Sequence, residues 1–165
     1  MLTIHTFCFN AFQENTFVLF NSEKEAIIVD PGCYLKHEQA QLANFISENN
    51  LTPKLLLNTH CHLDHVFGNN FVSETYGLTA LFHQKEQAVI DRLPEGGARW
   101  GVPTEAYKGK VQYIQQDELI QFGKDVFKVL ETPGHSPGSV CFYHEAQDFL
   151  IGGDLIFKDG VGRTD

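Results

Sequence analysis

Apolar residues along this chain fall into short runs that are bounded by turn-forming residues. Short runs rich in Phe, Val, Ile and Leu predict β-strands. The strands expected in the first half of the chain are residues 2–9, 15–20, 26–29, 54–57 and 78–82. The second half contains two expected hairpins, which pair residues 118–122 with 126–130 and residues 140–143 with 149–151.

Helical spacing of apolar residues appears between the early strands. In residues 35–49, Leu42 and Ile46 share one face with other apolar side chains, which predicts a helix. A second helical pattern follows Asp64 and is closed by Gly77, and residues 83–93 predict a short third helix. Residues 94–110 carry four glycines and two prolines and predict a loop or lid, whose Trp100 and Tyr107 either shape a substrate groove or simply pack.

The order of these elements predicts an α+β domain in which layered sheets carry helices on the outside. The chain of 165 residues is long enough to bury a core, and we expect residues 1–165 to form a single domain. The sequence contains 14 Phe against one Met and one Trp, which predicts a core packed largely with phenylalanine.

The net charge and the cysteine content limit which partners the protein can bind and in which cellular compartment it acts. The formal net charge of −9 argues against a nucleic-acid partner, because an acidic surface repels the phosphate backbone. The amino terminus lacks the features of a signal peptide, and no run approaches the ~18 apolar residues that span a membrane. The four cysteines form no C-x-x-C pair, which favours a reducing cytoplasm.

One segment carries an unusual density of metal-binding side chains. It follows the expected strand 54–57 and reads His60-x-His62-x-Asp64-His65. Residues two apart in an extended segment share a side, so His60 and His62 can bind one ion together. The helix that begins at Asp64 turns the backbone, so Asp64 and His65 can face a second ion. Imidazole and carboxylate suit zinc, and also iron or manganese.

Two later turns present matching chemistry. The turn at residues 132–138 holds His135 between two Pro-Gly pairs, which make a stiff corner. The segment Gly152-Gly153-Asp154 presents one carboxylate where the backbone can approach closely. Both turns and the His60 segment follow expected strands, so the three can converge at one rim.

A lone histidine is more often a packed or surface residue than a ligand, and His135 or Asp154 alone would fit ordinary turn roles. The cluster from His60 to His65 differs, because gathering so many titratable groups costs stability unless something binds them. Cys61 is expected to point away from the metal side of its extended segment. Four other histidines are expected to have no metal role: His5, His37, His83 and His144.

At these residues the sequence resembles the metallo-β-lactamase superfamily and, within it, the glyoxalase II-like hydrolases. The matching segments are Asp30-Pro31-Gly32, Thr59-His60-x-His62-x-Asp64-His65, Thr132-Pro133-Gly134-His135-Ser136-Pro137-Gly138, and Gly153-Asp154 with Gly162-Arg163-Thr164-Asp165. The first histidine motif is highly specific, whereas the other segments are weak signals alone. The resemblance implies an αβ/βα four-layer sandwich with a two-metal site at one edge.

The resemblance also implies a role for each residue. The ligands of a first ion would be His60, His62 and His135. The ligands of a second ion would be Asp64 and His65, with Asp154 bridging both. Asp30 would support the site without binding metal, and Asp64 would also be the catalytic residue that orients the nucleophile or receives its proton. The implied cofactor is zinc, as two ions, with iron or manganese as alternatives.

One departure from the family pattern concerns the end of the sequence. The family places a further histidine after these segments, in closing strands, whereas this sequence stops at Asp165. We therefore expect a fold that is incomplete at its C-terminus and a second site short of one ligand. Missing strands would expose apolar sheet surface, which a homo-oligomer would cover. We also expect no counterpart of the helical domain that binds glutathione in glyoxalase II, which weakens the expectation of a glutathione thioester.

The leading hypothesis is a cytoplasmic, metal-dependent hydrolase that cleaves a thioester or related ester bond of a small molecule. A metal-bound hydroxide, formed because the metal lowers the pKa of water to about 7, would attack the carbonyl. One alternative is a persulfide (sulfur) dioxygenase with a single iron on His60, His135 and Asp154, as in some relatives of this fold. Another is a non-catalytic metal-binding protein. A β-lactamase role is the least favoured, and the sequence identifies no substrate contacts.

Overall fold

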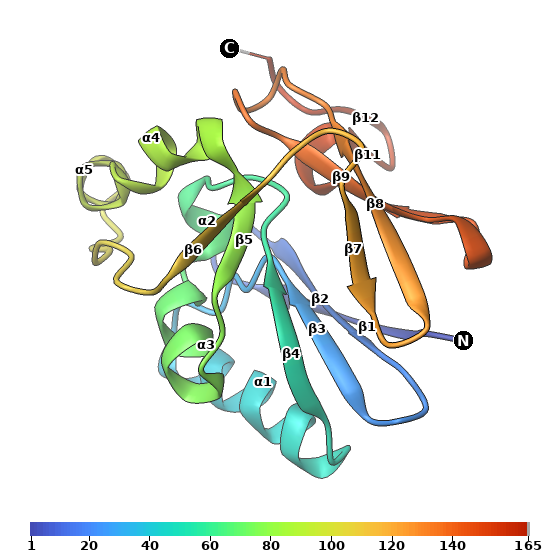
Figure 1. Cartoon of the computed structure of the whole chain (residues 1–165). Coiled ribbons are helices and arrows are strands. Elements are labelled where there is room, and N and C mark those ends of the chain that lie inside the picture. Colours follow the sequence, from blue (N-terminus) through green and yellow to red (C-terminus); the bar gives the residue numbers. More distant parts are fainter. Residues whose placement is uncertain (165) are drawn as a thin grey trace.

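A six-stranded mixed sheet forms the centre of the computed structural model, which describes residues 1–164 (Figure 1). Its strands lie in chain order: β1 (Thr3–Phe9), β2 (Glu14–Phe20), β3 (Glu25–Val29), β4 (Thr52–Leu57), β5 (Ala80–His83) and β6 (Val111–Ile114). The first three pair antiparallel, and β3 to β6 pair parallel. Because parallel strands point the same way, the segments that follow β3, β4 and β5 leave the sheet at one edge.

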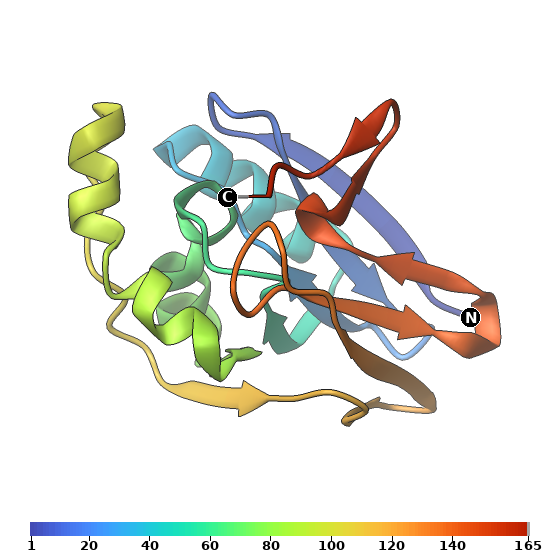
Figure 2. The same cartoon turned by 90° about the horizontal axis from the view of Figure 1, so that it is seen from above.

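A four-stranded antiparallel sheet packs on one face of the first (Figure 2). Its strands, in spatial order, are β10 (Phe149–Ile151), β9 (Val140–His144), β8 (Asp125–Glu131) and β7 (Leu119–Phe122). A small hairpin of β11 (Ile156–Phe157) and β12 (Gly160–Val161) follows. The two hairpins predicted at Gly123 and Ala146 are confirmed, and β11 and β12 are too short to be recognised from the sequence.

The α-helices lie on the opposite face of the six-stranded sheet (Figure 1). They are α1 (Lys36–Glu48), α2 (Leu63–Val66), α3 (Asn69–Tyr76), α4 (Gln87–Ile90) and α5 (Leu93–Trp100). Short 3-10 turns are η1 (Gln84–Glu86), η2 (Glu145–Gln147) and η3 (Gly153–Leu155). Residues 1–164 thus form a helical layer, two large sheets and a small two-stranded hairpin. The predicted α+β sandwich is confirmed, and three of its four expected layers lie within these residues, since no α-helix among them follows β6 to cover the second sheet.

Two apolar cores hold these layers together. One lies between the helices and the first sheet and includes Leu42, Ile28 and Phe82, and the other lies between the two sheets. The bulkiest fully buried side chains are four phenylalanines, as predicted: Phe9, Phe82, Phe127 and Phe142. Among residues 1–164, no helix has the length and apolar character needed to cross a membrane.

The predicted loop at residues 94–110 is wrong over its first half, which is helix α5. Pro94 stands in the first turn, where a helix tolerates proline because the missing N–H has no partner there. Gly97 is required because a Cβ there would lie 2.4 Å from the carbonyl oxygen of Val102. Gly101, at φ +69°, ends the helix. The glycines that suggested a loop therefore serve packing and capping.

Two other expectations need correction. The single helix predicted after Asp64 is divided into α2 and α3 at Gly68, whose backbone N–H donates to the carbonyl oxygen of Pro31 at 2.7 Å instead of continuing the helical hydrogen bonds. The short helix predicted at residues 83–93 begins only after His83, which belongs to β5. Strand β6 is not predicted from the sequence, because Val-Gln-Tyr-Ile is short and only its last residue is fully buried.

The inter-sheet core yields a stability prediction. Phe127 is 1% exposed between the sheets, so Phe127→Ala should lower the free energy of unfolding by about 3–5 kcal/mol. Leu119, on the neighbouring strand, is 65% exposed, and Leu119→Ala should cost less than about 1 kcal/mol. Urea denaturation of both variants measures the difference. Equal losses would show that the two sheets are not packed as described.

Candidate metal centre

Four strand ends bring the candidate residues together. Asp30 follows β3 directly, and His60 is the third residue after β4. The turn between β8 and β9 carries His135, and η3, after β10, carries Asp154. Residues from both sheets thus meet at one rim, as the sequence predicts.

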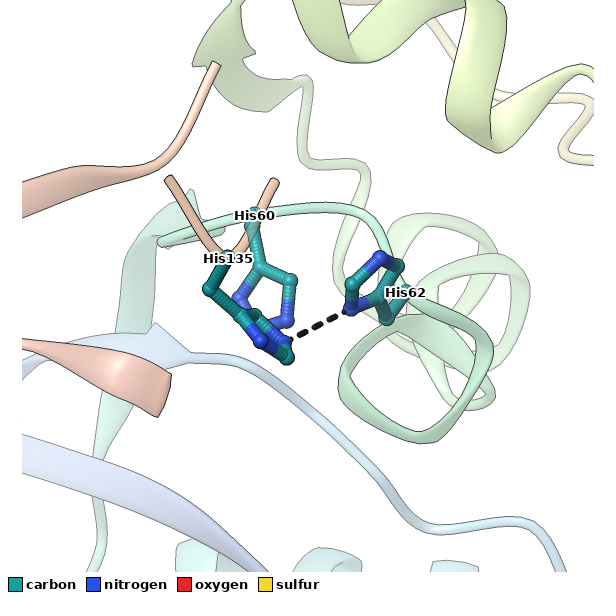
Figure 3. A group of neighbouring side chains, drawn as sticks. All are labelled: His60, His62 and His135. Carbon is teal, nitrogen blue, oxygen red and sulfur yellow. Dashed lines mark hydrogen bonds between the residues drawn. The ribbon is translucent and has the colours of Figure 1, made fainter. Parts of the chain in front are cut away.

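Three histidines form the core of the site, and Figure 3 shows their rings facing a common point. One ring nitrogen from each of His60, His62 and His135 lies within 4.8 Å of the others. The Nδ1 atom of His62 and the Nε2 atom of His135 are 2.9 Å apart and share a hydrogen bond. The ring centroids of His60 and His135 lie 4.9 Å apart. This is the set predicted for a first ion.

In His60 and His135, the Nδ1 atom lies within hydrogen-bond distance of a neighbouring group. His135 Nδ1 is 2.9 Å from the carbonyl oxygen of Arg163, so it donates there, and Nε2 is the unprotonated nitrogen that accepts from His62 and could bind a metal instead. His60 Nδ1 lies 3.1 Å from the hydroxyl of Thr59. His60 Nε2, in contrast, is buried and has no hydrogen-bond partner. A buried orphan nitrogen that faces two other imidazoles fits a metal ligand.

A second group shares His60 and adds His65 and Asp154, again with ligand atoms within 4.8 Å of one another. The two carboxylate oxygens of Asp154 point to different sides: Oδ1 lies 3.2 Å from His65 Nε2, and Oδ2 lies 3.4 Å from His135 Nε2. Asp64 lies beside this group, with Oδ2 3.6 Å from His65 Nε2. The residues predicted for two ions are therefore adjacent, and Asp154 lies between the two groups.

Asp30 touches two segments of the rim. Its Oδ1 accepts the backbone N–H of Thr59 at 2.8 Å, and its Oδ2 accepts the Thr59 hydroxyl at 2.6 Å. Oδ2 also lies 3.1 Å from His65 Nδ1, which orients the other ring nitrogen toward Asp154. This geometry agrees with the supporting role that the family resemblance implies for Asp30.

Two glycines allow close contact between the segments of the rim: Gly153 beside Thr59, and Gly162 beside Asp154. Gly153, at φ +51°, would place a Cβ 2.2 Å from the Thr59 hydroxyl oxygen. Gly162 would place a Cβ 1.7 Å from the carbonyl oxygen of Asp154. Larger residues at either position would push Asp154 out of reach of the histidines.

Burial sets the charge state of the histidines. Burial lowers the pKa of His62 to about 4, and the neighbouring rings of His135 and His65 act in the same direction. Burial also lowers the pKa of His60, again with help from neighbouring rings. Both imidazoles are therefore neutral near pH 7, the form that binds metal.

At His65, neighbouring carboxylates raise the pKa, whereas the pKa values of His60 and His62 are lowered. Burial disfavours its charge, but hydrogen bonds to Asp154 and Asp30 outweigh burial and raise the pKa of His65. The pKa of Asp154 is lowered, because hydrogen bonding and charge interaction with His65 outweigh its burial. In the metal-free chain the positive charge of protonated His65 offsets the negative charge of these carboxylates, and a bound cation would take over that role.

Glu14 is a further buried acid at this site, and sequence analysis missed it. Its Oε2 accepts the Thr16 hydroxyl at 2.8 Å, and its Oε1 is buried without a hydrogen-bond partner, 3.9 Å from His65 Nδ1. Glu14, Asp30 and His65 form a third compact group of potential ligands. The available signal is an acidic residue directly before the apolar part of an expected strand.

The remaining histidines and Cys61 lie outside the groups of potential metal ligands. His83 Nε2 lies 3.2 Å from Glu131 Oε1, and His144 Nε2 lies 3.0 Å from Asp125 Oδ1. His5 stacks on Phe45, and His37 is exposed. Cys61 belongs to the core beneath the helices, consistent with the expectation that it points away from the histidines.

A cavity of about 510 Å³ opens beside Asp64, His65 and Asp154. Its walls are rich in apolar side chains: Phe12, Phe17, Phe149, Ile156 and Phe157. Trp100 is 63% exposed and meets Phe12 edge to face at 5.8 Å, whereas Tyr107 packs on Ser73. The cavity is large enough for a small molecule.

Comparison with known proteins establishes the family. The sequence profile of the metallo-beta-lactamase superfamily matches residues 9–165. Hydroxyacylglutathione hydrolase GloC of Haemophilus influenzae is 34% identical over 157 residues, which cover 94% of this chain and 72% of that protein. The chain therefore belongs to the metallo-beta-lactamase superfamily, a superfamily of metal-dependent hydrolases.

Other members differ in activity. The mitochondrial persulfide dioxygenase ETHE1 of Bos taurus is 32% identical over 151 residues, covering 91% of this chain and 51% of that protein. Among solved structures, the B3 metallo-beta-lactamase BLEG-1 superposes with a TM-score of 0.89 at 33% identity, covering 99% of this chain and 77% of that one. TTHA1623 in a di-iron-bound form superposes with a TM-score of 0.85 at 28% identity, with coverages of 98% and 77%.

The buried acid Glu14 yields a pH prediction. Burial raises the pKa of Glu14 from 4.5 to about 9 in the folded chain, so the folded chain keeps a proton that the unfolded chain releases above about pH 4.5. The contribution of Glu14 to stability therefore falls as pH rises through this window. Glu14→Gln removes the effect, and the metal-free variant should gain stability over the parent between pH 5 and 8.

The gain should reach at most about 1.4 kcal/mol per pH unit, and urea denaturation of both metal-free proteins at several pH values measures it. A stability difference that does not change with pH would show that Glu14 is ionised in the folded chain.

Proposed function

We propose that this chain is a glyoxalase II-like hydrolase that cleaves a thioester or related ester bond of a small molecule with the help of two zinc ions. The observation that carries the proposal is the meeting of His60, His62 and His135 within 4.8 Å, with His60 Nε2 buried and unpartnered. The similarity to GloC, which is named a hydroxyacylglutathione hydrolase, supports the thioester class.

The metal-binding residues divide into two adjacent sets. His60, His62 and His135 would hold the first ion, and Asp64 and His65 would hold the second, with Asp154 shared between them. When bound, ions of this kind lower the pKa of a coordinated water and polarise a carbonyl group. Zinc suits this mixture of imidazole and carboxylate, although iron and manganese accept the same ligands.

Asp64 is the proposed catalytic residue. Its side chain is 20% exposed and lines the cavity, so it can reach both water and substrate. Burial raises the pKa of Asp64 above its usual value, which makes its carboxylate a stronger base. Asp64 would orient the attacking water or receive its proton, while the leaving thiolate departs into the cavity.

The cavity supports a partly apolar substrate. Phe12, Phe149 and Phe157 form walls beside the proposed catalytic residue and would pack against an acyl or thiol group. The four cysteines are free thiols, which supports a reducing cytoplasm as the place of action.

Removal of a ligand tests the metal and the activity together. His60→Ala and His135→Ala should each lose stoichiometric metal and at least about 99% of thioesterase activity, because the first ion would lose one of three imidazoles. His37→Ala, at an exposed histidine outside the site, should keep both. Elemental analysis and hydrolysis of a hydroxyacylglutathione thioester measure the outcome. Full thioesterase activity in the His60 and His135 variants would refute the proposal.

A persulfide dioxygenase is the second candidate, favoured by the 32% identity to ETHE1. The residues that would hold its single iron also meet here, with Asp154 Oδ2 3.4 Å from His135 Nε2 and His60 beside both. Oxygen uptake with glutathione persulfide separates the candidates. Iron with oxygen uptake favours the dioxygenase, two zinc ions with thioester hydrolysis favour the hydrolase, and metal without either activity leaves a binding protein.

A further inference from the structure

Glu86 is a buried carboxylate that lies outside the proposed ligand set. It ends η1, immediately beyond β5, and is 0% exposed. Its Oε2 accepts the backbone N–H of Cys61 at 2.7 Å. Its Oε1 accepts the hydroxyl of Ser136 at 2.6 Å and the backbone N–H of Gly138 at 2.7 Å. A single carboxylate thus accepts three hydrogen bonds.

The partners of Glu86 belong to the two segments that carry the three-histidine group. Cys61 stands between His60 and His62, and Ser136 directly follows His135. These segments are far apart in sequence and come from different sheets. Glu86 therefore connects both segments through a third element.

The packing around Glu86 is close. A Cβ at Gly138 would lie 2.8 Å from His83 Nδ1 and 3.1 Å from the backbone nitrogen of Glu86. His83 itself contacts Glu131, which precedes the His135 turn, at 3.2 Å. His83 therefore lies close to both ends of the turn that carries His135, at Glu131 and at Gly138. One backbone bond, from Val140 N–H to the Thr59 carbonyl oxygen, also joins the two segments but contacts no ligand ring.

The number of acceptor sites explains why a carboxylate is needed. All three partners are donors, so the side chain at residue 86 must accept with both of its oxygens. Glutamine has one carbonyl oxygen and one NH2 group, and its NH2 group would face either the Cys61 N–H or the Gly138 N–H. Either orientation sets two donors against each other and loses a backbone hydrogen bond to one histidine segment.

We propose that Glu86 is a positioning residue that fixes the His60–His62 segment relative to the His135 turn and thereby sets the affinity of the three-histidine group for a divalent cation. It acts through the backbone and contacts neither the substrate nor the ring nitrogens. The inference rests on the proposed function only in taking the three histidines as metal ligands.

The test compares Glu86→Gln with a matched control in the full chain. Glu38 is another buried glutamate, 7% exposed, whose carboxylate accepts backbone N–H groups at 2.7–2.8 Å. Its partners, Asn10, Tyr34 and Leu35, are not proposed ligands. The readouts are Co²⁺ affinity, from competition with a chromophoric chelator, and the visible spectrum of bound Co²⁺.

Glu86→Gln should bind Co²⁺ at least about tenfold more weakly than the parent, as is usual when a partner that orients metal ligands is lost, and with a changed spectrum. Glu38→Gln should show the parental spectrum and an affinity within about threefold of the parent, because its carboxylate stabilises a helix start instead. A folded Glu86→Gln protein with parental affinity and spectrum would overturn the inference.

Ser136→Ala keeps the inference testable if Glu86→Gln does not fold. This variant removes one of three hydrogen bonds and leaves those from Cys61 and Gly138, so it should fold and bind Co²⁺ about threefold more weakly. If Glu86→Gln does not fold and Ser136→Ala binds Co²⁺ with the parental affinity, the inference about Glu86 would also be overturned.

Failure of the proposed function gives a different result. A parent protein that binds Co²⁺ through the histidines but hydrolyses no thioester would refute the hydrolase proposal and leave the role of Glu86 standing.

Discussion

The paired hydrogen bonds between Asp30 and Thr59 are the contact on which the candidate metal centre depends. Asp30 is fully buried and adopts φ +48°, a conformation that most residues avoid, so its backbone is held there by its surroundings. Its two oxygens hold the Thr59 backbone and hydroxyl, and one of them also orients His65. The adjacent strands β3 and β4 thereby deliver their ends in one fixed arrangement.

Other parts of the rim are built onto this pair. Gly153 packs against Thr59, which brings Asp154 over the histidines. The Thr59 carbonyl accepts the backbone N–H of Val140, which ties the second sheet to the first. The site is therefore assembled from both sheets at once, and its geometry depends on how they pack.

Charge in the metal-free site is unevenly distributed. His60 and His62 are kept neutral by burial, whereas the proton on His65 offsets the nearby carboxylates Asp30 and Asp154. A buried imidazole nitrogen without a partner and a protonated acid at Glu14 are costly features for a fold that has no ligand. Their cost is consistent with a site shaped for cations.

The sequence predicts which residues meet at this rim because potential ligand chemistry is encoded locally. The spacing of His60, His62 and Asp64 and the Pro-Gly turn around His135 place donors at strand ends without knowledge of the packing. Glu14 and Glu86 escape prediction because their roles depend on tertiary contacts with residues more than twenty positions away in the chain or across the rim. Helix α5 escapes because its glycines signal a loop, while Gly97 is selected by contact with Val102.

Metal content with ligand identity is the most direct measurement of the central claim. X-ray absorption spectroscopy and elemental analysis of the purified full-length protein report both. We predict two ions per chain in an environment of imidazole nitrogen and carboxylate oxygen, without sulfur, because Cys61 is buried in the core beneath the helices. A chain purified without stoichiometric metal, and unable to bind zinc, iron or manganese when they are added, would contradict the claim.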